Sequence, residues 1–430
     1  MAASAVAIGA CLVTFRPLVA FCIPLVAGLM GLMFAVSRTP TGVDEDNLRR
    51  QLMAWTIGSL FLHLAIGMIV THSSLLNYLG PDALSYDKGA VGILLHWTKG
   101  FPFPTYLGVG KEGFYYLLAG IYWIFGASTA AGLVFNATLG AALVPLLADT
   151  TRRLFGRAVA RYAVPLAVLI PGVLIWSSQL LKEACVLFLI AVAANAAVRL
   201  SERVTPMAIV ALTGSIALMM TFRAPIGLVV AAGILVGLAA GRQQLLGGLT
   251  AVLGPLVLIA ILVVSVGFGY AGYRSAIHTD LAQAQVVRAG LAANVGSGFA
   301  EEADVSTTRG AVSYLPRGLV ANVLGPFPWQ LSGVRQLPAL ADVAVWWCLL
   351  PSLWRARNAG RRGERRRLLV LVAPAVAMTI VLSLTISNFG TVVRERTQVI
   401  VMVLPLIAFG LAQRRPVVGS VTETRELPAS

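Results

Sequence analysis

Residues 53–71 read MAWTIGSLFLHLAIGMIVT, a stretch without a single Asp, Glu, Lys or Arg. About 20 apolar residues are the length that crosses the hydrocarbon core of a bilayer as one helix. Similar runs recur along the 430-residue chain, which is 58% hydrophobic and only 12% charged. A soluble globule cannot bury so many apolar side chains, so the sequence predicts an integral membrane protein.

The apolar runs predict an all-α, polytopic protein with about twelve or thirteen helices. The predicted spans are 18–36, 53–71, 113–126, 130–147, 163–177, 184–200, 207–222, 226–240, 246–268, 339–354, 368–386 and 399–412. Residues 2–14 are too short to cross alone and are interpreted as half of a hairpin. The alternation typical of a β-barrel is absent from the sequence, which leaves helices to satisfy the backbone in lipid. A basic segment with a cleavage site is also absent, so we expect 18–36 to be retained.

The positive charges predict the orientation. The formal net charge is +15, and the segment RARNAGRRGERRR at 355–367 has seven arginines against one acidic residue. Such a connector is typical of the cytoplasmic side. Alternation of the spans then places 149–161, 199–204 and 241–245 on that side, and 176–183, the turn at Arg223, 270–338 and 387–398 on the other. We therefore expect an extracytoplasmic active site, and nucleic acid is not an expected partner.

The side of the loop 72–112 is left open, because its three lysines balance its three acidic residues. If 113–147 crosses twice, this loop lies in the cytoplasm. A further crossing or a re-entrant element would return it to the outer face. The predicted divisions are 1–52 (N-terminal span or spans and connector), 53–269 (transmembrane core with the loop 72–112), 270–338 (extracytoplasmic segment), 339–413 (C-terminal spans) and 414–430 (cytoplasmic tail).

The segment GPDALSYDKGA at 80–90 holds the first candidate residues, Asp82, Tyr86 and Asp87. A carboxylate at the mouth of a span can accept a proton from a hydroxyl, or orient a metal that neutralises a phosphate. The alternative is structural, with Pro81-Asp82 as an ordinary helix N-cap and Asp87 in a solvated pair with Lys88.

Lys182 and Glu183 open a predicted span and form the second candidate. The lysine is either a point charge for a lipid-linked phosphate, oriented by Glu183, or a side chain that reaches from a helix end to the interface.

The third candidate lies between the last two predicted spans, at Asn388, Arg394, Glu395 and Arg396. Arginines are depleted on the outer side, and their planar group binds phosphate oxygens with two hydrogen bonds. A local salt bridge at a helix end is the alternative.

Three residues elsewhere on the predicted outer side complete the candidate set. Arg223 in the turn FRAP and Arg317 are possible anion contacts, and Trp329 either stacks on a sugar or belongs to the aromatic belt of the interface.

Motifs for other chemistries are absent from the sequence. Neither a nucleotide-binding loop nor a nucleophile elbow occurs, and the four histidines have no metal-binding spacing. We predict no cofactor; a divalent metal stays open, although no ligand motif supports it.

Taken together, these stretches resemble the multi-span GT-C glycosyltransferases. The resemblance covers 53–200 and follows the order of the family: a carboxylate in the first outer loop, the aromatic segment GFYYLLAGIYWIFG at 113–126, the basic turn RRLFG at 152–156, Pro171 and Glu183. The pattern Asn-x-Gly-Thr-x-x-Arg at 388–394 is similar to that of bacterial polysaccharide-assembly membrane proteins, some of which are called O-antigen polymerases.

The resemblance implies an enzyme of the bacterial plasma membrane with an extracytoplasmic active face. It would move a sugar from a polyprenyl-phosphate-linked donor to a glycan or lipid acceptor, surrounded by membrane lipid. Asp82 matches the catalytic base, with Asp87 as the fallback, and Lys182, Arg394 and Arg396 would hold phosphate.

Two alternatives belong to other classes. A polymerase or ligase of lipid-linked polysaccharide would depend on Arg223, Arg317 and Arg394, with Asp82 dispensable. A transporter or flippase would need internal repeats or helices broken at mid-membrane, and the sequence shows no convincing repeat.

Overall fold

A computed structural model describes residues 28, 31, 43–105, 107, 111–241, 281–293, 298–300, 302–330, 337–357 and 362–413. Within these residues the protein folds into 14 α-helices and one short 3-10 helix. The predicted span 246–268, the tail 414–430, residues 2–14 and all of 18–36 except two positions lie outside the described residues.

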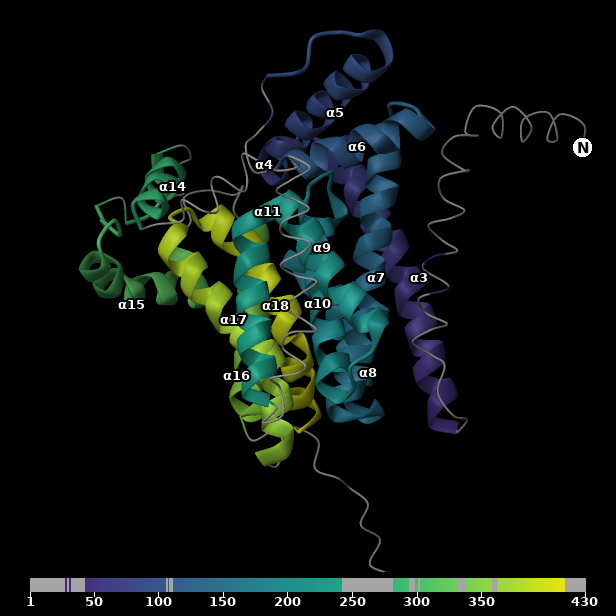
Figure 1. Ribbon diagram of the computed structural model, residues 1–430, viewed down its shortest axis with the longest axis vertical. Coiled ribbons are helices and arrows are strands. Elements are labelled where there is room, and N and C mark those ends of the chain that lie inside the picture. The colour runs from purple at the N-terminus through teal and green to yellow at the C-terminus, as the bar shows by residue number, and fades with distance from the viewer. Residues whose placement is uncertain are drawn as a thin grey trace, which may run out of the picture.

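The long helices form the bundle, as Figure 1 shows. They are α3 (Val43–Thr71), α7 (Thr129–Phe155), α10 (Glu183–Glu202), α11 (Pro206–Gly241), α16 (Leu337–Ala356), α17 (Arg362–Thr385) and α18 (Phe389–Ala412). The shorter helices are α4 (Leu76–Leu79), α5 (Pro81–Lys99), α6 (Glu112–Phe125), α8 (Arg157–Leu169), α9 (Pro171–Ser178), α14 (Leu281–Ala293) and α15 (Thr308–Leu324). In the described part of the chain six helices are long and apolar enough to cross a membrane, or seven if the bent pair α8–α9 counts as one span. The prediction of an all-α polytopic membrane protein is confirmed.

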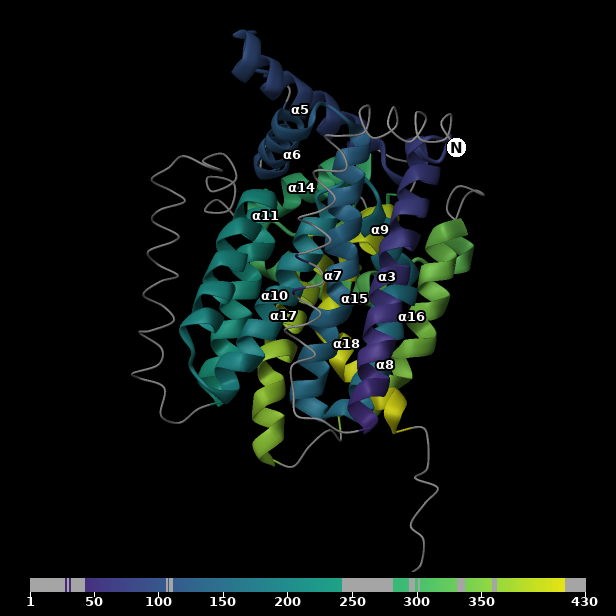
Figure 2. The same ribbon diagram turned by 90° about the vertical axis from the view of Figure 1, so that its right-hand side faces the viewer.

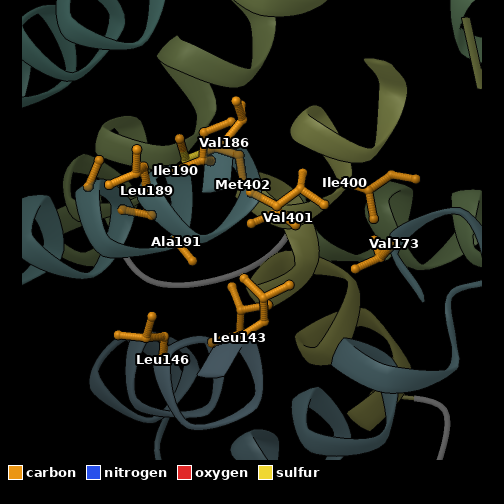
Figure 3. Close-up of a cluster of buried hydrophobic side chains, with 14 of the residues drawn as sticks. Leu143, Leu146, Val173, Val186, Leu189, Ile190, Ala191, Ile400, Val401 and Met402 are labelled. Atoms are coloured by element: carbon orange, nitrogen blue, oxygen red, sulfur yellow. The ribbon is translucent and has the colours of Figure 1, made fainter. Parts of the chain in front are cut away.

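Helix α18 lies at the centre of the apolar packing. Figure 3 shows its residues Ile400, Val401 and Met402 among side chains of α7, α9 and α10, such as Leu143 and Ile190. All five of these side chains are fully buried. The position of α18 fixes where its first turns, with their charged residues, meet the other helices.

A buried aspartate joins α7 and α10 at one end of the bundle. Asp149 accepts hydrogen bonds from Arg152 (2.6 Å), Arg153 (2.9 Å) and Arg199 (2.7 Å), and also from Asn195 (3.0 Å). We call this the Asp149 end. It is the end that the positive-inside rule assigns to the cytoplasm.

Helix α11 is a hairpin of two helical arms joined at Arg223. The backbone of Arg223 is extended (φ −161°, ψ 77°), and Pro225 begins the second arm. The arms pack closely, because a Cβ on Gly227 would lie 2.9 Å from Cγ of Met220. The predicted turn at Arg223, between two helical segments, therefore matches the structure.

The prediction that residues 113–126 span the membrane is wrong. Helix α6 has only 14 residues, and at ~1.5 Å per residue it is shorter than the ~30 Å hydrocarbon core. It packs beside α5 instead, and both views show α5 projecting past the ends of the long helices (Figures 1 and 2). From the pair α5–α6 the chain therefore crosses the bundle once, through α7, to reach the Asp149 end. The loop 72–112 lies at the opposite end, which we call the Arg394 end.

Glycines let α11 and α17 approach each other. A Cβ on Gly237 would collide with the backbone carbonyl of Leu369, whereas a Cβ on Gly214 of the same helix would meet nothing within 4 Å. These two positions separate the effect of close packing from the effect of helix propensity.

We predict that Gly237→Ala lowers the free energy of unfolding by about 1–3 kcal/mol, because the backbones of α11 and α17 must move apart. Gly214→Ala is the matched control, and it should leave stability unchanged or raise it slightly through helix propensity. Thermal unfolding of both variants in the same lipid or detergent measures the difference. Equal melting temperatures for the two variants would contradict the close packing.

Candidate functional site

Arg394 is the centre of the candidate site. It lies in the second turn of α18, and its Nη1 is 3.0 Å from Oδ2 of Asp82 on α5. Its Nε is 3.4 Å from Oε1 of Glu183, the first residue of α10. One guanidinium therefore joins three helices that are far apart in the sequence.

A second ion pair extends the cluster to α11. Arg223, at the kink of α11, binds Glu395 Oε2 through Nη1. Oε1 of the same carboxylate is 3.7 Å from Nε of Arg394, and Oε2 accepts a 2.5 Å hydrogen bond from Gln398. The kink that the sequence predicted thus places Arg223 against α18.

Lys182 is buried beside this pair, with only 3% of its surface exposed. Its Nζ donates to the carbonyl oxygen of Phe222 at 3.4 Å. Burial, followed by the charge of Arg223, lowers the pKa of Lys182 well below its ordinary 10.5. An anion that binds between this buried amine and the guanidinium would stabilise the charged form of the amine.

Tyr86 brings a neutral donor to the cluster. Burial raises the pKa of its phenol, and the carboxylates of Glu183 and Asp82 raise it further. Its ring packs edge-on against Phe114, with centroids 4.9 Å apart. Among the described residues its buried hydroxyl has no hydrogen-bond partner.

Asp82 is the most accessible carboxylate of the cluster, with 37% of its side chain exposed against 3% for Glu183 and for Glu395. Burial is the largest single influence and opposes its ionisation. The nearby positive charges outweigh burial, Arg394 first and Lys111 next, and they hold the pKa of Asp82 below 3.8. Asp82 is therefore ionised at neutral pH and open on one side.

The local sequence explains why Asp82 stands where it does. Pro81 is the first residue of α5 and Gly80 precedes it, so the helix starts at a fixed point. A carboxylate in the first turn is stabilised by the helix dipole. The structural alternative, an N-cap at Pro81-Asp82, is wrong, because Gly80 is the N-cap and no side chain caps α5. Asp82 lies within the first turn of the helix, and this position brings its carboxylate to Arg394.

The structure brings together seven of the predicted residues, which we call the Arg394 cluster: Asp82, Tyr86, Lys182, Glu183, Arg223, Arg394 and Glu395. Arg396 is not among them. Its Nη2 is 2.9 Å from Oδ2 of Asp342, and its Nη1 donates to the carbonyl oxygen of Gly325 at 2.6 Å. Oδ1 of Asp342 also accepts from the backbone N–H of Gly172 in the first turn of α9. Residues two apart on a helix point in different directions, so Arg394 and Arg396 cannot share one site. Arg396 instead ties α18 to the break between α8 and α9.

Asp87 and Asn388 have structural partners. Asp87 accepts a 2.5 Å hydrogen bond from the hydroxyl of Tyr122 on α6. The side chain of Asn388 accepts from the backbone N–H of Thr391 and caps α18. No ion pair in the described residues joins Asp87 to the cluster.

Arg317 and Trp329 also lie apart from the cluster. Arg317 forms an exposed pair with Glu302 at 2.6 Å, and Trp329 is 78% exposed and stacks on Phe327 with centroids 4.9 Å apart. The structure gives neither residue a contact with the Arg394 cluster.

Three neighbours of the site were not predicted. The guanidinium of Arg394 lies over the ring of Trp176 at 5.9 Å, Gln398 bonds Glu395, and Lys111 acts on Asp82 through its charge. Gln398 stands four residues after Arg394, so helical spacing was a signal that it shares the same face. The sequence offered no comparable signal for Lys111.

The described residues contain no group of three or more His, Cys, Asp or Glu side chains placed to hold a metal ion. No family model, curated protein or solved structure matches the chain. The functional assignment therefore depends on the chemistry of the Arg394 cluster.

We predict that Arg394→Gln lowers stability by about 3–5 kcal/mol, because it leaves the buried Glu183 without its guanidinium. Arg317→Gln makes the same chemical change in an exposed pair and is the matched control, for which we expect no measurable effect. Thermal or denaturant unfolding in lipid compares the two. If both variants unfold like the parent protein, Arg394 does not hold the cluster together.

Proposed function

We propose that the protein is a membrane glycosyltransferase that moves a sugar from a polyprenyl-phosphate-linked donor to a cell-envelope acceptor. The observation that carries the proposal is the contact between Asp82 and Arg394, which are 312 residues apart in the sequence. It joins a carboxylate that can take a proton to a cation that can hold a phosphate. The Arg394 end would face the outside, since the Asp149 end carries the arginines expected in the cytoplasm.

The buried cations suit the leaving group. Arg394 and Arg223 stand close together beside three carboxylates, with the amine of Lys182 next to them, and a site with little water strengthens each charge interaction. In the transfer step the acceptor oxygen bonds to the anomeric carbon, and the bond from that carbon to the phosphate oxygen breaks. The acceptor proton goes to Asp82, and the lipid phosphate leaves with its charge held by these cations.

Donor binding would also tune the base. In the free protein the charge of Arg394 keeps the pKa of Asp82 low, which makes Asp82 a weak base. A phosphate bound to Arg394 would neutralise that charge, and the pKa of Asp82 would rise because burial already favours the protonated form. Proton transfer would thus become favourable only when the donor is in place.

A transporter or flippase is a second candidate, favoured by the break between α8 and α9. The two helices meet at a 53° bend, and Asp342 binds the first turn of α9. Broken helices inside the membrane are common at the binding sites of transporters. Such a protein would move the lipid-linked sugar without breaking the bond to phosphate.

A polymerase or ligase of lipid-linked polysaccharide shares the same cations. Of its three predicted arginines, Arg223 and Arg394 lie in the cluster, whereas Arg317 does not. This alternative differs from the main proposal in one respect that can be measured, because Asp82 would be dispensable.

We predict that Asp82→Asn lowers the rate of sugar transfer by about 10²–10⁴-fold, the usual contribution of a general base. The assay uses purified protein in lipid with a panel of polyprenyl-phosphate sugars. Asp304→Asn, the same change at an exposed acid in the segment before α15, is the matched control and should retain the parent rate. Parent-like transfer by a folded Asp82→Asn variant would exclude Asp82 as the base and favour the polymerase or ligase. Movement of the intact donor from one leaflet of a vesicle membrane to the other, without sugar transfer, would instead favour the flippase.

We also predict that kcat/KM and kcat lose activity at different pH values as the solution is made acidic. Asp82 must be deprotonated to act, so activity falls as the pH drops through its pKa. For kcat/KM, which reports the free enzyme, this fall should lie below pH 3.8, and for kcat it should lie at higher pH because the donor neutralises Arg394. Coincident falls would show that the donor does not bind at Arg394.

A further inference from the structure

The pair α5–α6 carries a group of stacked aromatic rings at a distance from the Arg394 cluster. Trp97, near the last residue of α5, stacks on Tyr116 of α6 with centroids 6.1 Å apart and planes 25° apart. Phe103 stacks on the same tyrosine at 6.4 Å and 29°. Phe101 lies between them in the sequence. We call these four residues the aromatic surface.

The aromatic surface is open although its rings are held in place. Trp97 is 47% exposed, Phe101 54% and Phe103 41%. His96 fixes the connector by a 2.7 Å hydrogen bond to the carbonyl oxygen of Phe101 and by an edge contact with the ring of Phe103. Rings that are rigid and exposed at once offer contact area at a low entropic cost.

The position of this surface relates it to the candidate site. Asp82 is in the first turn of α5, and Trp97 is 15 residues further along the same helix, about 22 Å away. Both views show α5 projecting past the ends of the long helices (Figures 1 and 2). One continuous helix therefore links the proposed base to the aromatic surface.

We propose that the aromatic surface binds an extended oligosaccharide, which is the acceptor whose terminal hydroxyl reaches Asp82. The apolar faces of sugar rings stack on aromatic side chains, and two exposed polar residues, Thr98 and Lys99, directly follow Trp97 in the sequence. A ligand that covers about 22 Å must be a chain of several sugars rather than a single one. This inference deepens the proposed function and rests on it, since it names the acceptor as a glycan chain.

Lipid is the competing occupant, because tryptophan and lysine also gather at the membrane interface. Two observations favour the glycan. The aromatic surface is at the end of a helix that leads away from the bundle, and the rings of Trp97 and Phe103 gather on the single ring of Tyr116.

The test measures binding of soluble glycans to the full chain in lipid nanodiscs. The probes are cellohexaose, maltohexaose and chitohexaose, each compared with its monosaccharide by saturation-transfer NMR and by titration. We expect at least one hexasaccharide to bind while the monosaccharides do not. Trp97→Ala should weaken that binding roughly tenfold. Trp354→Ala removes another exposed tryptophan, 67% exposed against 47% for Trp97, from the last turn of α16, far from α5, and should change nothing.

Two results would overturn the inference. One is the absence of binding by every hexasaccharide at its solubility limit. The other is quenching of Trp97 emission by brominated lipid in the nanodisc, measured as the difference between the parent and Trp97→Phe, because it would place the ring in the bilayer.

The outcomes separate this inference from the proposed function. Binding that depends on Trp97 and persists in Asp82→Asn supports the glycan site even if transfer is lost. Transfer by Trp97→Ala with an unchanged KM for a glycan acceptor would overturn the inference and leave the glycosyltransferase proposal intact.

Discussion

A buried arginine needs carboxylates, and this constraint organises one end of the protein. The guanidinium of Arg394 forms ion pairs with Asp82 and with Glu183, so α5, α10 and α18 must meet at one point. Glu395, the next residue, extends the constraint to the kink of α11 through Arg223. Removing water from these charges is costly, and only their mutual pairing compensates for the cost.

The same helix serves two networks through consecutive residues of a single turn. Arg394 and Glu395 point to the site, while Arg396 points to Asp342 and the break between α8 and α9. Because α18 is rigid and buried, the site and the break are held in a fixed relation. A ligand that drew Arg394 away from its carboxylates would therefore act on a helix that also holds the broken span, which is relevant to an enzyme and to a transporter alike.

The two ends of the bundle use charge in different ways. At the Asp149 end one buried aspartate forms ion pairs with Arg152, Arg153 and Arg199, whose side chains stay partly exposed. At the Arg394 end three carboxylates, two arginines and the amine of Lys182 are packed together, and Asp82 is the open member. Arginines gathered at one end of the helices are what the positive-inside rule describes, whereas buried, mutually perturbed ionisable groups are common at binding and reaction sites.

The sequence by itself determined the class of the protein, because apolar runs of spanning length can satisfy their backbone only as helices in lipid. It also determined the turn at Arg223 and singled out Asp82, Lys182, Glu183 and Arg394. The tertiary structure alone decided which of these residues meet. Contacts such as Asp82 with Arg394 join segments 312 residues apart, and spacing along the chain carries no information about them. The role of α6 was decided in the same way: its composition is that of a span, but its 14 residues are too few to cross, and only the packing against α5 shows where it lies.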